Sequence, residues 1–244
     1  MSVKTLRKEF DKLYKKENLS NKNTASYPVN LILDATFFGR KYGFLCFLNA
    51  ETSKIIYYKE IVSENIASLN YCLDILISKG YSFKSFTLDG KRGFINLLKQ
   101  RFSNTPIQMC LFHQKAIIRR YITNNPQSIC GIELKELMKN IKSLNCYEFV
   151  EELYSLQEKY KEFLLERNQH NEFKHNRLRS AFRSLRTNLP YLFSCKEHSE
   201  LNIPSTSNKV ENLFSHLKEK IKIHRGLSEK RKKQAIRFLL DEKS

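Results

Sequence analysis

A short apolar run that leads directly into an acid, Leu31-Ile32-Leu33-Asp34, most limits how this chain can fold. A continuous aliphatic run of this length is typical of a buried strand and is too short for a typical helix. A carboxylate at the end of such a strand is held where charge is costly, which favours a role in binding a cation. The alternative is an ordinary Asp that turns the chain at a strand end. The pattern occurs again at Leu88-Asp89.

The region from residue 27 to residue 121 is predicted to be an α/β core in the order β-β-β-α-β-α-β-α. Three strands joined by short turns predict an antiparallel meander, and the helices supply the crossovers that parallel strands need. This is the order of the ribonuclease H-like fold, whose first and fourth strands are neighbours, so Asp34 and Asp89 are expected at adjacent strand ends. The predicted strands are 29–36, 42–48, 54–61, 83–89 and 106–113, and the predicted helices are 66–77, 94–102 and one from Gln114.

The region from 122 to 203 is predicted to be an all-helical insertion before the last catalytic helix. Its apolar residues recur at helical spacing in three stripes. It contains 12 basic and 11 acidic residues, so it is nearly neutral. His170 and His175 are candidate metal ligands, but without acids or cysteines clustered nearby they are better interpreted as part of a solvated loop.

The last region, residues 204–244, is predicted to be a closing helix with a basic tail. Asn208 is the predicted N-cap, and Glu211 follows three residues later, where a capping-box acid would also stand. Glu211, Lys218 and Lys222 share one helix face, as a metal-binding carboxylate beside phosphate-binding lysines requires. Nine basic residues lie between Lys218 and Arg237.

The charge of the chain indicates a polyanionic partner. Of its 244 residues, 43 are Lys or Arg and 25 are Asp or Glu, a formal net charge of +18. Such an excess is typical of nucleic-acid binding. Residues 1–26 are predicted to form a basic amphipathic helix and a linker, which could be a helix-turn-helix remnant.

The six cysteines include no CxxC pair, which argues against a zinc ribbon. Neither a secretory signal nor an apolar run long enough to span a membrane is evident. We therefore expect a reduced, cytoplasmic protein without a membrane partner, nucleoid-associated in a bacterium.

Several short motifs in this order resemble the catalytic region of DDE transposases of bacterial insertion sequences, related to the Mutator-like group. They are Leu33-Asp34-Ala35-Thr36, Leu88-Asp89-Gly90, Cys110-x-x-His113 and Ser207-Asn208-Lys209-Val210-Glu211-Asn212, followed by His224-Arg225-Gly226-Leu227-Ser228. The resemblance covers roughly Tyr27 to Arg237. It differs at the amino end, where only residues 1–26 stand in place of a zinc ribbon and a helix-turn-helix, so a shortened amino terminus is expected.

The resemblance implies metal-dependent strand cleavage and strand transfer on DNA at the ends of a mobile element. Asp34, Asp89 and Glu211 would be catalytic and would hold two divalent cations, with Mg²⁺ expected and Mn²⁺ as the alternative. Cys110 and His113 would support them, although Cys110 has a simpler interpretation as a buried core thiol. The expected partners are transposon ends and target DNA, bound by a homodimer or a higher assembly. The predicted DNA-binding residues are Lys218, Lys222, Arg225, Lys115 and Arg119.

Two alternatives remain open from the sequence. A related ribonuclease H-like nuclease or resolvase would cut without joining, and would share the three acids. A catalytically silent DNA-binding remnant is the other, and the presence of all three acids argues against it.

Overall fold

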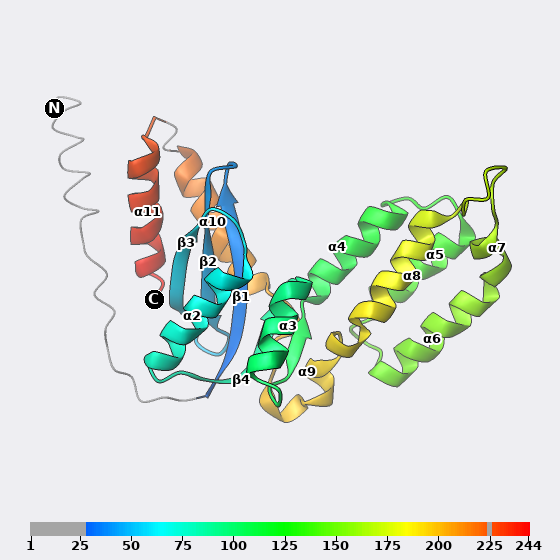
Figure 1. Ribbon diagram of the computed structural model, residues 1–244, viewed down its shortest axis with the longest axis horizontal. Helices are drawn as coiled ribbons and strands as arrows, with labels where there is room; N and C mark the ends of the chain where they lie inside the picture. Colours follow the sequence, from blue (N-terminus) through cyan, green and yellow to red (C-terminus); the bar gives the residue numbers. More distant parts are fainter. Residues whose placement is uncertain (1–27, 224–225) are drawn as a thin grey trace. The chain divides into compact units, whose positions relative to one another are not determined.

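The computed structural model describes residues 28–223 and 226–244, which divide into two compact units (Figure 1). The first unit holds the described residues up to 86, residues 92–105 and those from 207 onward; the second holds 87–91 and 106–206. The predicted helix within residues 1–26 and the predicted DNA-binding residue Arg225 lie outside the described residues.

The protein is α/β with a five-stranded mixed sheet, as the order of strand and helix patterns predicts. The strand order is β3-β2-β1-β4-β5. The first three strands form the predicted antiparallel meander, in which Asp34 of β1 stands opposite Cys46 of β2. The strands are β1 (Pro28–Phe38), β2 (Tyr42–Asn49), β3 (Ile55–Ile61), β4 (Ser82–Leu88) and β5 (Ile107–Met109).

Four helices accompany the strands of the first unit, and they divide between the two faces of the meander. Alternate side chains of β3 show the division, because successive residues of a strand point to opposite faces. On one face the Lys59 ammonium lies 3.8 Å from the Tyr71 ring centroid of α2. On the other, the Tyr58 hydroxyl donates to Asp241 of α11 at 2.7 Å. The helices are α2 (Ile66–Ser78), α3 (Arg92–Arg101), α10 (Asn208–Ile223) and α11 (Glu229–Asp241).

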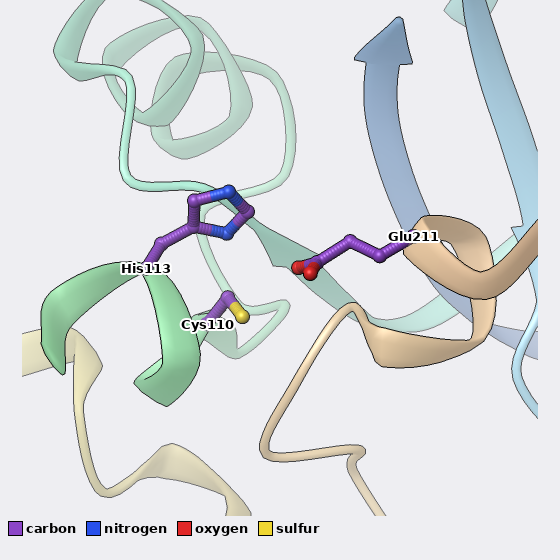
Figure 2. A group of neighbouring side chains, drawn as sticks. All are labelled: Cys110, His113 and Glu211. Atoms are coloured by element: carbon purple, nitrogen blue, oxygen red, sulfur yellow. The ribbon is translucent and has the colours of Figure 1, made fainter. Parts of the chain in front are cut away.

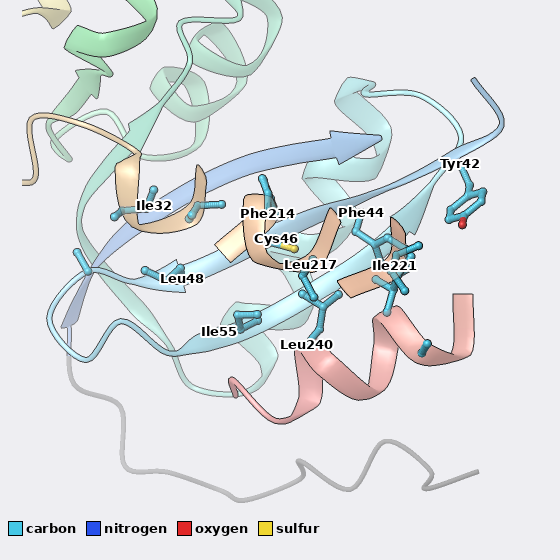
Figure 3. Close-up of a cluster of buried hydrophobic side chains, with 14 residues drawn as sticks. Ile32, Tyr42, Phe44, Cys46, Leu48, Ile55, Phe214, Leu217, Ile221 and Leu240 are labelled. Carbon is cyan, nitrogen blue, oxygen red and sulfur yellow. The ribbon is translucent and has the colours of Figure 1, made fainter. Parts of the chain in front are cut away.

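A buried apolar cluster joins α10 and α11 to the sheet (Figure 3). From α10 it takes the predicted stripe, in which Phe214 and Leu217 are almost fully buried. From β2 it takes every second residue (Tyr42, Phe44, Cys46 and Leu48), and from β1 it takes Ile32. Burying a Leu or Phe side chain stabilises a fold by roughly 1.5–3 kcal/mol, so this cluster fixes α10 firmly on the sheet.

Two strand boundaries differ from the sequence-based expectation. β1 continues to Phe38, four residues beyond Asp34, because β2 pairs with it from Leu31 to Phe38. Asp34 is therefore inside its strand and not at its end. β5 stops at Met109, and the helix α4 (Leu111–Ile122) follows after Cys110. His113 consequently lies in the first turn of a helix and not at the end of a strand.

Apart from β5 and the last two residues of β4, the regular elements of the second unit are helices. They contain the apolar stripes predicted for residues 122–203. Their buried faces include Leu134, Phe149 and Phe182. α4 packs against α8, and the Asn188 amide donates to Gln114 at 2.8 Å, so the unit is larger than the predicted insertion. Its other helices are α5 (Ile129–Asn140), α6 (Cys146–Lys159), α7 (Lys161–Leu165), α8 (Asn176–Asn188) and α9 (Ser194–Glu197), with short 3₁₀ turns at Leu189–Tyr191 and Ser199–Leu201.

The loop between α7 and α8 shows the setting of the two histidines considered as metal ligands. His175 stacks on Phe163 with 3.7 Å between ring centroids, and its Nε2 lies 3.4 Å from a Glu166 oxygen. His170 is exposed in the turn. Within the described ranges neither histidine belongs to a group of three potential metal ligands. Among residues 28–223 and 226–244, no helix is both long and apolar enough to cross a bilayer.

We predict that Glu60 makes stability depend on acid pH. Burial alone raises the pKa of the Glu60 carboxyl, but Lys233 at 2.7 Å and Arg237 at 2.6 Å outweigh it and hold this pKa below its usual value. Because the folded pKa is lowered, the stabilisation is complete above the unfolded pKa of about 4.3 and is lost as pH falls through the folded value. Glu60→Gln should lower the free energy of unfolding at pH 7 by about 1 kcal/mol.

Urea unfolding at pH 7 and at pH 3.5 measures this difference. The parent and Glu60→Gln should differ less at pH 3.5 than at pH 7. The matched control is Glu219→Gln, which removes an exposed carboxylate of the same unit and should leave stability nearly unchanged. An equal loss at both pH values would contradict the proposed ionic origin.

Candidate active site

Asp34 lies on the face of the sheet that α10 covers. Its partner across the antiparallel pair is Cys46, and paired residues project to the same side. Cys46 packs in the cluster with Phe214 and Leu217, so the Asp34 side chain shares the α10 side of the sheet. The Ala35 N–H donates to Asp34 Oδ1 at 2.8 Å, which helps to hold the half-buried carboxylate in place.

Two polar groups beside Asp34 on this face of the sheet are buried, the Cys46 thiol and the Thr36 hydroxyl. Burial raises the pKa of the Cys46 thiol far above its usual range, and the charge of Asp34 raises it further. Two residues along the same face, the hydroxyl of Thr36 is buried and has no hydrogen-bond partner within the described residues. A carboxylate in such surroundings is stabilised by a nearby cation, and its oxygens are ligands that Mg²⁺ and Mn²⁺ prefer.

Glu211 lies in the first turn of α10, and a buried serine helps to orient it. The Ser207 hydroxyl donates to Glu211 Oε1 at 2.8 Å. The Ser207 carbonyl accepts from the N–H groups of Val210 and Glu211, so Ser207 is the N-cap. The predicted N-cap, Asn208, is instead the first helical residue and is exposed. Glu211 and Asp34 thus belong to one unit, on the same side of its sheet.

Asp89 belongs to the second unit, directly after β4. The chain turns there at Gly90, whose φ of +89° favours glycine. A Cβ at Gly90 would also stand 2.5 Å from the Met109 side chain. The Lys91 N–H donates to Asp89 Oδ1 at 3.0 Å, which fixes the carboxylate at the turn.

Cys110 and His113 stand close to this turn, in the same unit. The Cys110 N–H donates to the Leu88 carbonyl at 2.7 Å, so Cys110 is beside the residue that precedes Asp89. The Cys110 sulfur and a His113 ring nitrogen lie within 4.8 Å of each other. Figure 2 shows Cys110 just ahead of α4, His113 in its first turn and Glu211 in the first turn of α10. The predicted catalytic residues therefore come from both units, and their convergence on one pair of ions stays a prediction.

A basic hollow of about 530 Å³ lies in the first unit, where the β1–β2 turn meets α10 and α11. It includes Lys218 and Lys222, as expected from their shared helix face. It also includes Arg40 and Lys41, which the sequence-based reasoning missed although they are adjacent basic residues in a turn. The charged residues of the basic hollow are Arg40, Lys41, Lys218, Lys222, Lys232 and one acid, Glu229.

The last two residues of the basic run have a structural use. Lys233 and Arg237 both pair with Glu60, and the Lys233 ammonium lies 4.6 Å from the Tyr42 ring centroid. They stabilise the contact between α11 and β3. The predicted DNA path in this unit is therefore better centred on the basic hollow than on the whole run.

The predicted DNA-binding residues of α4 lie in the second unit. Lys115 is half-buried and donates to the Lys139 carbonyl at 3.2 Å. Burial and the charge of Lys142 lower the pKa of its ammonium. Arg119 is exposed one turn further along the helix. Both side chains line an apolar groove between α4 and α5.

Comparison of the chain with protein-family models and with curated proteins finds no match.

Proposed function

We propose that this protein is a DDE transposase with a ribonuclease H-like core, which cleaves DNA strands and transfers them. One observation carries the proposal. The half-buried carboxylate of Asp34 shares a sheet face with α10, which presents the serine-bonded Glu211 in its first turn and the lysines of the basic hollow further along. Carboxylates for hard cations and ammonium groups for phosphates thus occur on one helix and the strand beside it.

The sheet order also supports the proposal. β1 is the central strand, its neighbours are β2 and β4, and the first three strands run antiparallel. This is the arrangement that a ribonuclease H-like core requires. It brings the strand that carries Asp34 beside the strand that Asp89 follows, so the proposal includes Asp89 as the third carboxylate.

Each residue then has a definite task. Asp34, Asp89 and Glu211 would hold two divalent cations, Mg²⁺ or alternatively Mn²⁺, and such ions would supply Lewis-acid activation of the attacking oxygen and stabilisation of the leaving oxygen. The Ala35 and Lys91 N–H groups and the Ser207 hydroxyl keep the three carboxylates oriented. Thiolate and imidazole suit softer metals, so Cys110 and His113 are proposed to position the Asp89 turn.

The proposed partner is DNA, bound by a homodimer or a higher assembly. The net charge of +18 and the basic hollow favour a polyphosphate partner. The proposed place of action is the cytoplasm, on the bacterial nucleoid.

The catalytic proposal predicts loss of cleavage in three isosteric variants. Purified protein with Mg²⁺ or Mn²⁺ should nick a plasmid that carries the DNA flanking the coding region, and EDTA should abolish the reaction. Asp34→Asn, Asp89→Asn and Glu211→Gln should each slow cleavage about a thousandfold, because a lost ion removes several kcal/mol of transition-state stabilisation.

Glu200→Gln, which removes an exposed acid without a proposed role, should cleave like the parent. Circular dichroism should show all four variants folded. Cleavage without joined products would favour the nuclease alternative, and metal-dependent activity in all three carboxylate variants would refute the proposed site.

The basic hollow predicts which lysines contact duplex DNA. Lys218→Ala and Lys222→Ala should weaken binding and reduce the slope of log K against log salt by about 0.9 each, one phosphate contact apiece. Arg40→Ala should behave in the same way. Fluorescence anisotropy in EDTA at several salt concentrations measures the slope without cleavage.

Lys220→Ala is the matched control, since Lys220 is exposed on the same helix but does not line the hollow. It should retain the slope of the parent. Equal slopes in Lys218→Ala, Lys222→Ala, Arg40→Ala and the parent would show that the duplex binds elsewhere.

A further inference from the structure

The groove between α4 and α5 in the second unit has an apolar floor. It encloses about 230 Å³, and Ile118, Ile122 and Met138 lie along it. A second, more open hollow adjoins it on α4, and Phe112 and Arg119 line both. A flat apolar group bound in the groove would therefore lie beside the Phe112 side chain.

Phe112, in the first turn of α4, is a large apolar side chain that is 46% exposed. It is held from one side, where its ring meets the His113 ring edge-on with 6.0 Å between centroids. Leaving so large an apolar ring in solvent has a hydrophobic cost. Exposed aromatic rings beside cations are the means by which single-stranded nucleic acids are bound, because every base has a face that can stack.

The charge around the groove is positive. Lys115, Arg119, Lys135 and Lys139 line it, and no carboxylate within the described residues lines either hollow. Glu136 pairs with Lys139 at 2.5 Å. Lys115 and Lys135 donate to main-chain carbonyls, of Lys139 and Asn124, and so their charges are not neutralised by these contacts. An anionic ligand would supply the missing negative charge.

We propose that the α4–α5 groove binds single-stranded nucleic acid, with an unpaired base stacked on Phe112 and the adjoining phosphates on Lys115, Arg119 and Arg120. A duplex offers phosphates to the cations of the groove but no base to the Phe112 ring, since its bases are already stacked with one another. The apolar floor and the exposed ring are instead complementary to a base outside a helix. The inference goes beyond the proposed strand chemistry and rests only on residues of the second unit.

The test measures binding of the full chain to a labelled 20-nucleotide oligo-dT and to a 20-base-pair duplex, in EDTA and at several salt concentrations. Phe112→Ala should weaken oligo-dT binding about tenfold with little change in salt slope, and should leave duplex binding unchanged. Phe112→Tyr should bind like the parent, because it keeps the ring. Arg119→Gln should reduce the single-strand slope by about 0.7.

A stacking readout separates contact from indirect effects. Oligo-dT with one 2-aminopurine should lose fluorescence on binding the parent and Phe112→Tyr, and should lose less on binding Phe112→Ala. Tyr147→Ala is the matched control, since Tyr147 is an exposed aromatic residue of α6 outside the groove, and it should behave like the parent. Thermal unfolding should show each variant folded.

Three results would overturn the proposal: no binding of oligo-dT by the parent, equal affinity of Phe112→Ala and the parent, or loss of affinity in Arg119→Gln alone, which would leave only a phosphate contact. The binding assays contain no metal ion, so they do not depend on cleavage. A protein that never cleaves DNA would refute the proposed function and would leave this result unaffected.

Discussion

The packing of α10 against the sheet is the contact on which the candidate site depends. Phe214 and Leu217 are buried against the face that carries Ile32 and Cys46. With this side of α10 anchored, Glu211 is held beside the buried stripe, and Asp34 is confined to the covered face of β1. A helix held only by polar contacts could rotate and carry Glu211 away, whereas rotation here would expose two large apolar side chains.

The same constraint divides the basic residues of the carboxyl end into two groups. α11 packs on the meander through Ala235, Ile236 and Leu240, which brings Lys233 and Arg237 within reach of Glu60. Those two cations pair with carboxylates of their own unit, both with Glu60 and Lys233 also with Glu229. Lys218, Lys222 and Lys232 face the hollow at the β1–β2 turn, where the described residues contribute one acid, Glu229. The basic run of the sequence is thus divided in the structure. Lys233 and Arg237 form an ion cluster with Glu60, and the lysines of the basic hollow form a surface with excess positive charge.

Sequence reasoning predicted the order of the elements because the apolar periodicities of strands and helices differ clearly between residues 28 and 122. It misplaced the boundary at Cys110, since the apolar residues from Met109 to Phe112 continue through the end of a strand and into a helix. It also placed the cap on Asn208, because serine and asparagine are both good N-caps and stand side by side. The pairing of Asp34 with Cys46 and the contribution of Arg40 and Lys41 follow from strand register and turn geometry, which a linear pattern does not contain.

The two surfaces with excess positive charge differ in what they offer a nucleic acid. The basic hollow has two aromatic residues, but Tyr42 is 5% exposed and Phe38 is partly buried and stacks on it, so neither ring is as exposed as that of Phe112. Its cations suit the regularly spaced phosphates of a duplex. The α4–α5 groove combines Lys and Arg side chains with a half-exposed Phe112 and an apolar floor. Because stacking requires a base outside a double helix, the two surfaces should respond to different states of one substrate: the first to paired strands, the second to a strand whose bases are free.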